Sequence, residues 1–203
     1  MRELSRGTRL AVIGDAAAEG LSVKGNSYSD LLRAQLEENG SQTTLLNLAY
    51  TGYQASDSSK LLQEVVAFDP SIIIIAHGIT EALIRPKQEA MRLIPSRWRQ
   101  VGWLDPRPYF SRRLWKSVYH RSESGIGWRV KVYLIKKYGG CTLTSVEDFE
   151  QMLANIVSTL LQETKATIIL LTYNGTDERI ILIRFLPCNA IKSALHRSLR
   201  IAI

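Results

Sequence analysis

Short apolar runs separated by amphipathic stretches mark the strands of this chain. Thr8 to Ile13 (TRLAVI) is an apolar run followed by Gly-Asp, and Ser71 to Ala76 (SIIIIA) is rich in β-branched residues and uncharged. Such runs are typical of strands buried in a parallel sheet. Thr43 to Leu48 and Thr167 to Leu171 have a similar character. The pattern therefore predicts four strands.

Helical periodicity fills the intervals between these strands. Ser27 is placed to cap a helix that ends near Gly40. Its face would be formed by Tyr28, Leu31, Leu32, Gln35 and Leu36. A second helix should run through Leu61, Leu62, Val65 and Val66. It must stop near Asp69-Pro70, because proline disfavours helical geometry at the residue before it.

A third helix is indicated by two overlapping capping boxes, Thr144 with Glu147 and Ser145 with Asp148, and the sequence leaves both open. Its apolar positions are Phe149, Met152, Leu153, Ile156, Leu160 and Leu161. Alternation of short strands with helices predicts a three-layer α/β/α sandwich with a parallel sheet of the flavodoxin-like type. Ligands of such sheets bind beyond the carboxyl ends of the strands. The loops of interest are therefore 14–20, 49–56 and 77–83.

Composition fits one globular domain covering residues 1–203, with 45% hydrophobic and 22% charged residues. There is no apolar run long enough for a membrane span, and the N-terminus passes through Arg2, Glu3, Arg6 and Arg9 into a strand-like segment. We therefore expect no signal peptide and a cytoplasmic location. Two cysteines, Cys141 and Cys188, and three histidines predict reduced thiols, no metal and no other cofactor.

The charge of +7 is unevenly distributed. Residues 85–140 hold 14 basic and three acidic residues, a balance of +11, so the rest of the chain carries −4. This segment is predicted to be an insertion after the third strand, a cap or arm. It contains Arg97, Trp98, Trp103, Arg99, Arg112, Arg113, Trp115, Lys116, Trp128 and Arg129.

Two interpretations of this basic arm remain open. Interleaved arginine and tryptophan suit anionic polymers, membrane headgroups or stacking on sugars and bases. Alternatively, the arm is a solvated lid whose tryptophans pack on the body. Specific nucleic acid binding is not expected, because no recognisable nucleic-acid motif is present.

Three motifs stand at the ends of the first three predicted strands. IGDAAAEG covers residues 13–20, NLAYTGYQASD covers 47–57 and HGITEAL covers 77–83. In this order they resemble the conserved blocks of the SGNH/GDSL-type ester hydrolases. ALIRP and the Arg/Trp-rich stretch after it are similar to a bacterial subgroup associated with surface-glycan genes. The resemblance implies hydrolysis or transfer of an acyl ester, such as an O-acetyl group on a glycan.

The same resemblance exposes departures from the family. Gly14, Asp15 and Gly20 match the first block, but Ala16 stands where the nucleophilic serine is expected. Gly52 corresponds to the glycine that offers its N–H to the oxyanion. Thr80 replaces the asparagine that donates to the oxyanion, and Glu81 replaces an aspartate. The resemblance thus implies a vestigial pocket outlined by Asp15, Gly52 and Thr80, with His77 and Glu81 at its rim.

The last family block, Asp-x-x-His, does not occur after Asn174: His196 is the only later histidine, and Ser193 lies three residues before it. Since alanine has no oxygen to attack an ester, we expect little or no serine-hydrolase activity. Without a nucleophile nearby, His77 is a structural or substrate-contacting residue rather than a base. Cys141 has no histidine at a suitable spacing and is not expected to act as a substitute nucleophile.

Residues after Asn174 predict a strand at Ile180 to Leu186 and a helix at Asn189 to Ile203, which is shorter than the family's ending. A truncated or frame-altered gene, a fragment or a degenerate paralogue would each explain this. Ala16 is either an engineered replacement of serine or the result of natural drift. Besides an inactive ester hydrolase, two functions stay open: a binding module for an acylated or anionic glycan, and a protein that binds a partner through the arm.

Overall fold

The computed structural model describes residues 7–20, 27–96, 99, 127 and 129–171. These divide into two compact units, which we describe separately. The first contains the described residues up to Glu81 and those from Thr144 to 171; the second contains those from Ala82 to Leu143. The prediction of a single domain with an insertion at 85–140 stays a prediction.

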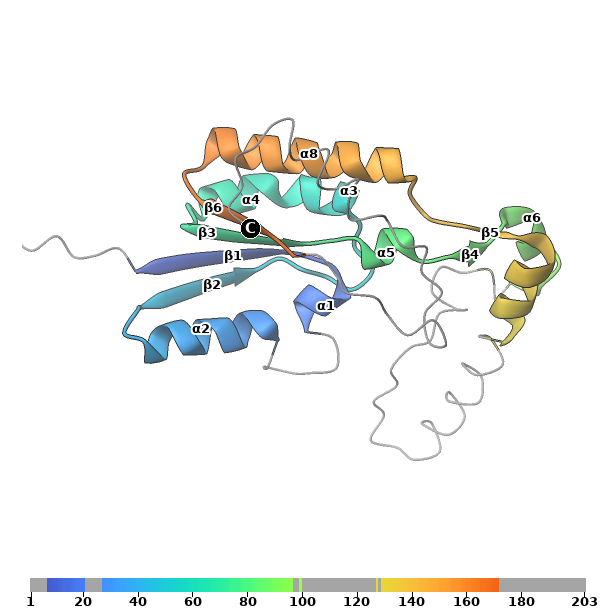
Figure 1. Cartoon of the computed structure of the whole chain (residues 1–203), viewed down its shortest axis with the longest axis horizontal. Helices are drawn as coiled ribbons and strands as arrows, with labels where there is room; N and C mark the ends of the chain where they lie inside the picture. The colour runs from blue at the N-terminus through green and yellow to red at the C-terminus, as the bar shows by residue number, and fades with distance from the viewer. Residues whose placement is uncertain (1–6, 21–26, 97–98, 100–126, 128, 172–203) are drawn as a thin grey trace, which may run out of the picture. The chain divides into compact units, whose positions relative to one another are not determined.

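A parallel four-stranded sheet forms the centre of the first unit (Figure 1). Its strands are β1 (Thr8–Gly14), β2 (Thr43–Asn47), β3 (Ile72–Ala76) and β6 (Thr167–Leu170). They lie in the order β2-β1-β3-β6. All four predicted strands are confirmed within one residue at each end. This order is the beginning of the flavodoxin-like arrangement.

Helices cover both faces of this sheet, so the unit has three layers (Figure 1). Alternate residues of each strand point to opposite faces. Ala11 and Ile13 pack with α3 (Ala55–Ser58), α4 (Leu62–Ala67) and α8 (Val146–Glu163). Leu10 and Val12 pack with α1 (Ala16–Glu19) and α2 (Tyr28–Glu38). The predicted three-layer α/β/α fold is confirmed.

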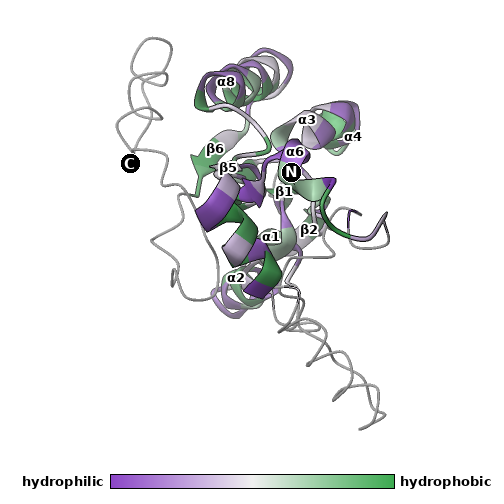
Figure 2. Cartoon of the chain, turned by 90° about the vertical axis from the view of Figure 1, so that its right-hand side faces the viewer, coloured by the Kyte–Doolittle hydropathy of each residue, from purple (hydrophilic) through white to green (hydrophobic). Residues whose placement is uncertain are grey.

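The predicted helix ends follow local capping chemistry. Ser27 caps α2 in a reciprocal box with Asp30. Of the two boxes open at the third predicted helix, the structure selects Ser145 with Asp148: the Ser145 hydroxyl accepts from the Asp148 N–H at 3.0 Å. α8 carries both hydrophilic and hydrophobic residues (Figure 2). Its buried residues recur mainly at spacings of three and four, as on one face of an amphipathic helix: Phe149, Leu153, Ile156, Val157 and Leu160.

The helix predicted through Leu61 to Val66 is divided in the structure. It consists of α3, a 3₁₀ turn η1 (Ser59–Leu61) and α4, which ends at Ala67. The predicted stop before Asp69-Pro70 is confirmed. Asp69 takes a positive φ of 50° there, a left-handed conformation that terminates the helix.

The second unit is small. β4 (Arg85–Pro86) pairs antiparallel with β5 (Gly140–Cys141). α6 (Gln88–Met91) packs on the helical residues 129–138 through a core of Ala90, Ile94 and Leu134. The strand predicted at Ile180 to Leu186 and the helix predicted at Asn189 to Ile203 lie outside the described residues. In the described part of the chain, no helix is long and apolar enough to cross a membrane.

Candidate functional site

The three loops singled out in the sequence meet at the carboxyl end of the sheet. The Asp15 N–H donates to the Ala76 carbonyl at 3.2 Å, which ties the first loop to the end of β3. The Tyr50 N–H donates to the Gly14 carbonyl, also at 3.2 Å, which ties the second loop to the end of β1. The arrangement places the three motifs side by side, as parallel strand order requires.

Gly14 allows the first motif to turn tightly out of β1. A Cβ atom at this position would lie 2.5 Å from the Ala76 carbonyl oxygen and 2.7 Å from the Ala18 Cβ. Only glycine fits between β3 and α1 at such a close approach. Glycine at this position is therefore required by packing.

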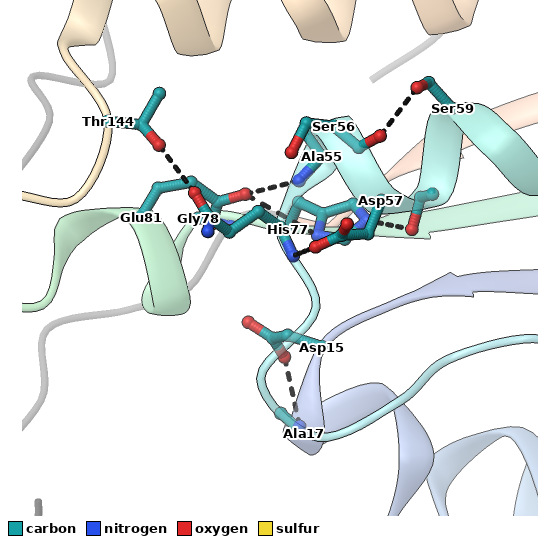
Figure 3. A network of polar contacts seen from close by, with 12 residues as sticks. Asp15, Ala17, Ala55, Ser56, Asp57, Ser59, His77, Gly78, Glu81 and Thr144 are labelled. Atoms are coloured by element: carbon teal, nitrogen blue, oxygen red, sulfur yellow. Dashed lines mark hydrogen bonds and ion pairs between the residues drawn. The ribbon is translucent and has the colours of Figure 1, made fainter. Parts of the chain in front are cut away.

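Asp15 is buried, with 1% of its surface exposed, and it caps α1. Its Oδ1 accepts the Ala17 N–H at 3.0 Å (Figure 3). Ala16 is the first residue of α1 and is half-buried. At the position corresponding to the family's nucleophile, the chain therefore presents a methyl group.

The second loop is held by two side chains that the sequence analysis did not single out. Glu19 Oε2 accepts from the Thr51 N–H at 2.6 Å and from the Thr51 hydroxyl. Asn47 Nδ2 donates to the Ala18 carbonyl at 3.2 Å. These contacts fasten the loop to α1 just before Gly52, which is exposed, has a φ of 85° and faces open space at its Cβ position. Such ties across loops leave no signal in a single sequence.

Glu81 fastens the third loop to α3. It lies on α5 (Ile79–Ala82) and is 2% exposed. Its Oε1 accepts the Ala55 N–H at 2.7 Å, and its Oε2 accepts the Gly78 N–H at 3.1 Å (Figure 3). Thr80, on the same helix, is also buried. Glu81 thus holds the loop ends together by accepting two backbone hydrogen bonds.

His77 is buried against α3. Its Nε2 lies 2.7 Å from the Ser58 Oγ, and its Nδ1 lies 3.8 Å from the Glu81 Oε1. His77 is 7% exposed and Ser58 is fully buried. The resemblance placed His77 and Glu81 at the rim of a pocket, whereas the structure places both side chains in the interior.

Burial determines the protonation of this cluster. It lowers the pKa of His77 to about 4, and the nearby Asp57 carboxylate opposes the shift. Burial also raises the pKa of Glu81, while the N–H groups of Ala55 and Gly78 lower it and Asp15 raises it further. His77 is therefore neutral at neutral pH.

Ser58, His77 and Glu81 have the residue types of a Ser-His-acid triad, but their geometry fits a structural role. A catalytic serine must reach its substrate, and the Ser58 side chain has no exposed surface. The orienting acid of a triad accepts a hydrogen bond from the imidazole. At 3.8 Å, the Glu81 oxygen is beyond hydrogen-bond distance from Nδ1.

Of the residues named for the basic arm, Arg99 and Arg129 belong to the described part of the chain. The Arg99 guanidinium donates to the carbonyls of Ile94 and Arg92, each at 2.9 Å, which caps the turn after α6. Arg129 is exposed on the helical residues 129–138. The other residues named for the arm lie outside the described residues: Arg97, Trp98, Trp103, Arg112, Arg113, Trp115, Lys116 and Trp128. Cys141 is an exposed free thiol on β5.

Two further features concern ligands. Searched over the described residues, no group of three His, Cys, Asp or Glu side chains gathers to hold a metal ion. A polar pocket lies at the opposite, amino-terminal end of the sheet and is lined by Gly7, Arg9, Gln42, Thr44 and Asp69. It contains none of the motif residues.

The structure is similar to solved ester hydrolases, although no protein-family model and no curated protein matches the sequence. A GDSL-like lipase from Parabacteroides merdae superposes with a TM-score of 0.52 at 12% identity, covering 95% of this chain and 72% of that one. AlinE4, an SGNH-hydrolase family esterase, superposes with a TM-score of 0.51 at 12% identity, covering 96% of this chain and 72% of AlinE4. LAE5, an α/β hydrolase enzyme from the Lake Arreo metagenome, superposes with a TM-score of 0.51 at 17% identity, covering 94% of this chain and 73% of LAE5. The chain therefore has the SGNH-hydrolase fold, and the predicted likeness is confirmed at the level of the fold.

Proposed function

We propose that this SGNH-fold chain derives from acyl ester hydrolases or acyltransferases and has lost serine-dependent hydrolysis. The observation that carries the proposal is Ala16 at the start of α1, next to the Asp15 cap. Thr80 in place of the asparagine donor supports it. Loss of the nucleophile alone removes on the order of 10⁶-fold in turnover from a serine hydrolase.

Hydrolysis of p-nitrophenyl acetate tests this proposal. The purified chain should release p-nitrophenol at the rate of the buffer blank. Ala16→Ser should add little, because a serine without a histidine base remains a weak nucleophile. Turnover well above the blank that survives alanine substitution of both His77 and Cys141 would contradict the proposal.

A second candidate function, binding of an acylated glycan, is supported by an aromatic pair on the second loop. Tyr50 and Tyr53 lie with ring centroids 4.8 Å apart, and Tyr50 is 41% exposed. The Tyr50 N–H is bonded to Gly14, so the pair stands beside the motif that contains Ala16. Exposed aromatic rings that are held in place offer contact area at low entropic cost.

Isothermal titration with acetylated and deacetylated forms of one oligosaccharide tests this second function. The second function is supported if the acetylated oligosaccharide gives a heat of binding with the parent and none with Tyr50→Ala. The absence of heat with both forms counts against it. Tyr138→Ala, an exposed tyrosine of the second unit, is the matched control.

A further inference from the structure

The helical residues 129–138 of the second unit have one face in the core and one in solvent. Val130 and Leu134, four residues apart, pack against Ala90 and Ile94 of the α6 segment. Arg129, Tyr133, Lys136 and Lys137 follow at helical spacings of four, seven and eight residues and are exposed. Together with Tyr138, which is 40% exposed, we call them the basic–aromatic face.

Contacts within the basic–aromatic face hold its charge in place. Lys137 Nζ donates to the Tyr133 hydroxyl at 3.2 Å. It also lies 5.6 Å from the Tyr133 ring centroid and 5.2 Å from that of Tyr138, within cation–π range. Hydrogen bonds with Tyr133, which has the larger effect, and with Tyr138 raise the pKa of Lys137, so its positive charge persists at alkaline pH.

The whole unit has an excess of positive charge. Its described residues include one acid, Glu89. The bases are Arg85, Lys87, Arg92, Arg99, Arg129, Lys131, Lys136 and Lys137. Among the described residues, no carboxylate forms an ion pair with Arg129, Lys136 or Lys137. These three cations are therefore available to an external anion.

Exposed aromatic surface accompanies this charge. Tyr133 is 57% exposed and Tyr138 is 40% exposed, and both rings lie within cation–π range of Lys137. A soluble polyanion would neutralise the cations but would leave these rings in water. An anionic bilayer surface accommodates both, because lysine and arginine contact the headgroups while the tyrosine rings enter the boundary with the acyl chains.

We propose that the basic–aromatic face is a peripheral binding site for a membrane surface rich in anionic lipids. The inference is independent of Ala16 and of ester chemistry, because it concerns the other unit. Attraction to an anionic leaflet is worth about 1 kcal/mol per cation near the surface, which is about fivefold in affinity. It weakens with ionic strength as the charges are screened.

Co-sedimentation of the full chain with vesicles tests this site. We expect binding to phosphatidylglycerol/phosphatidylcholine vesicles, little binding to pure phosphatidylcholine, and loss of binding in 0.5 M salt. The combined variant Arg129→Gln, Lys136→Gln and Lys137→Gln should bind about 100-fold more weakly, as the product of three fivefold effects. Circular dichroism verifies that each variant is folded.

The matched control removes three exposed cations from the first unit: Arg33→Gln, Lys60→Gln and Lys165→Gln. It has the same net charge as the test variant and should retain vesicle binding. An equal loss in the control would overturn the proposal, because binding would then follow net charge and not this face.

Tyr133→Ser and Tyr138→Ser distinguish a bilayer from a soluble polyanion. Each should weaken vesicle binding several-fold by removing apolar contact with the lipid boundary. If both variants bind vesicles as the parent does, and heparin or poly(U) binds as tightly as the vesicles, the face is a site for soluble polyanions and the proposal is wrong.

Discussion

His77 shows how the environment of one residue determines its chemistry. Histidine usually titrates near pH 6.5, but burial lowers the pKa of His77 to about 4. In the unfolded chain the imidazole binds a proton at a higher pH than in the folded chain. Protons are therefore taken up on unfolding as the pH falls through this window, and stability is lost.

We predict that His77 makes the protein acid-labile between about pH 6.5 and 4. Above about pH 6.5, the pKa of the imidazole in the unfolded chain, His77 does not change the free energy of unfolding. Protonation of the unfolded chain lowers this free energy by about 2 kcal/mol at pH 5 and about 3 kcal/mol at pH 4. Urea unfolding of the parent and of His77→Gln, each at pH 7.5 and pH 5, measures it. The free energy of unfolding should fall more for the parent than for the variant.

The comparison between the two proteins is needed because Glu81 acts in the opposite direction. Its raised pKa means that protonation favours the folded chain as the pH falls. This contribution is common to the parent and to His77→Gln. Equal acid sensitivity of the two proteins would show that His77 is not the group responsible.

At the scale of elements, helix ends are determined by individual side chains. The sequence offered two capping boxes before α8, and the Ser145 hydroxyl forms the cap with the Asp148 N–H. The Thr144 hydroxyl instead donates to the Oε1 of Gln54 at 2.8 Å, and Gln54 lies 90 positions earlier in the sequence. This long-range contact could not be read from the local pattern.

We predict that Ser145→Ala lowers the free energy of unfolding by about 1 kcal/mol, the usual value of an N-cap. Ser145→Asn keeps a side-chain oxygen for the Asp148 N–H and should be close to neutral. Chemical denaturation of both variants provides the measurement. If alanine and asparagine are equally destabilising, the cap at Ser145 is not what stabilises the start of α8.

At the scale of the whole molecule, the layers are held by apolar contacts between α8 and the sheet. Leu160 has no exposed surface and lies in the core formed with β1 and β3, whereas its neighbour Leu161 is 42% exposed. The two residues have the same side chain and the same local propensity. Their difference arises from the direction in which each points.

Leu160→Ala should therefore destabilise the protein by about 2–5 kcal/mol, the cost of a cavity in a packed core. Leu161→Ala should cost less than about 1 kcal/mol, because an exposed leucine loses little on truncation. Thermal unfolding followed by circular dichroism compares the two. A similar loss of stability in both would contradict the placement of α8 on the sheet.

The sequence by itself determined the four strands, the Ser27 cap of α2, the helix stop before Pro70 and the three-layer class. Periodicity and caps report local geometry directly, which is why the four strands and the stop before Pro70 could be predicted. It also determined that Ala16 cannot act as a nucleophile, since this depends only on the identity of the side chain.

The tertiary structure alone decided what surrounds each motif residue. It buried His77 and Glu81, which the resemblance had placed at a rim, and it brought Ser58 to within 2.7 Å of the His77 imidazole. It also tied the Gly52 loop to Glu19 through Thr51. Burial and long-range hydrogen bonds depend on which elements pack together, and a local pattern of residues does not carry that information.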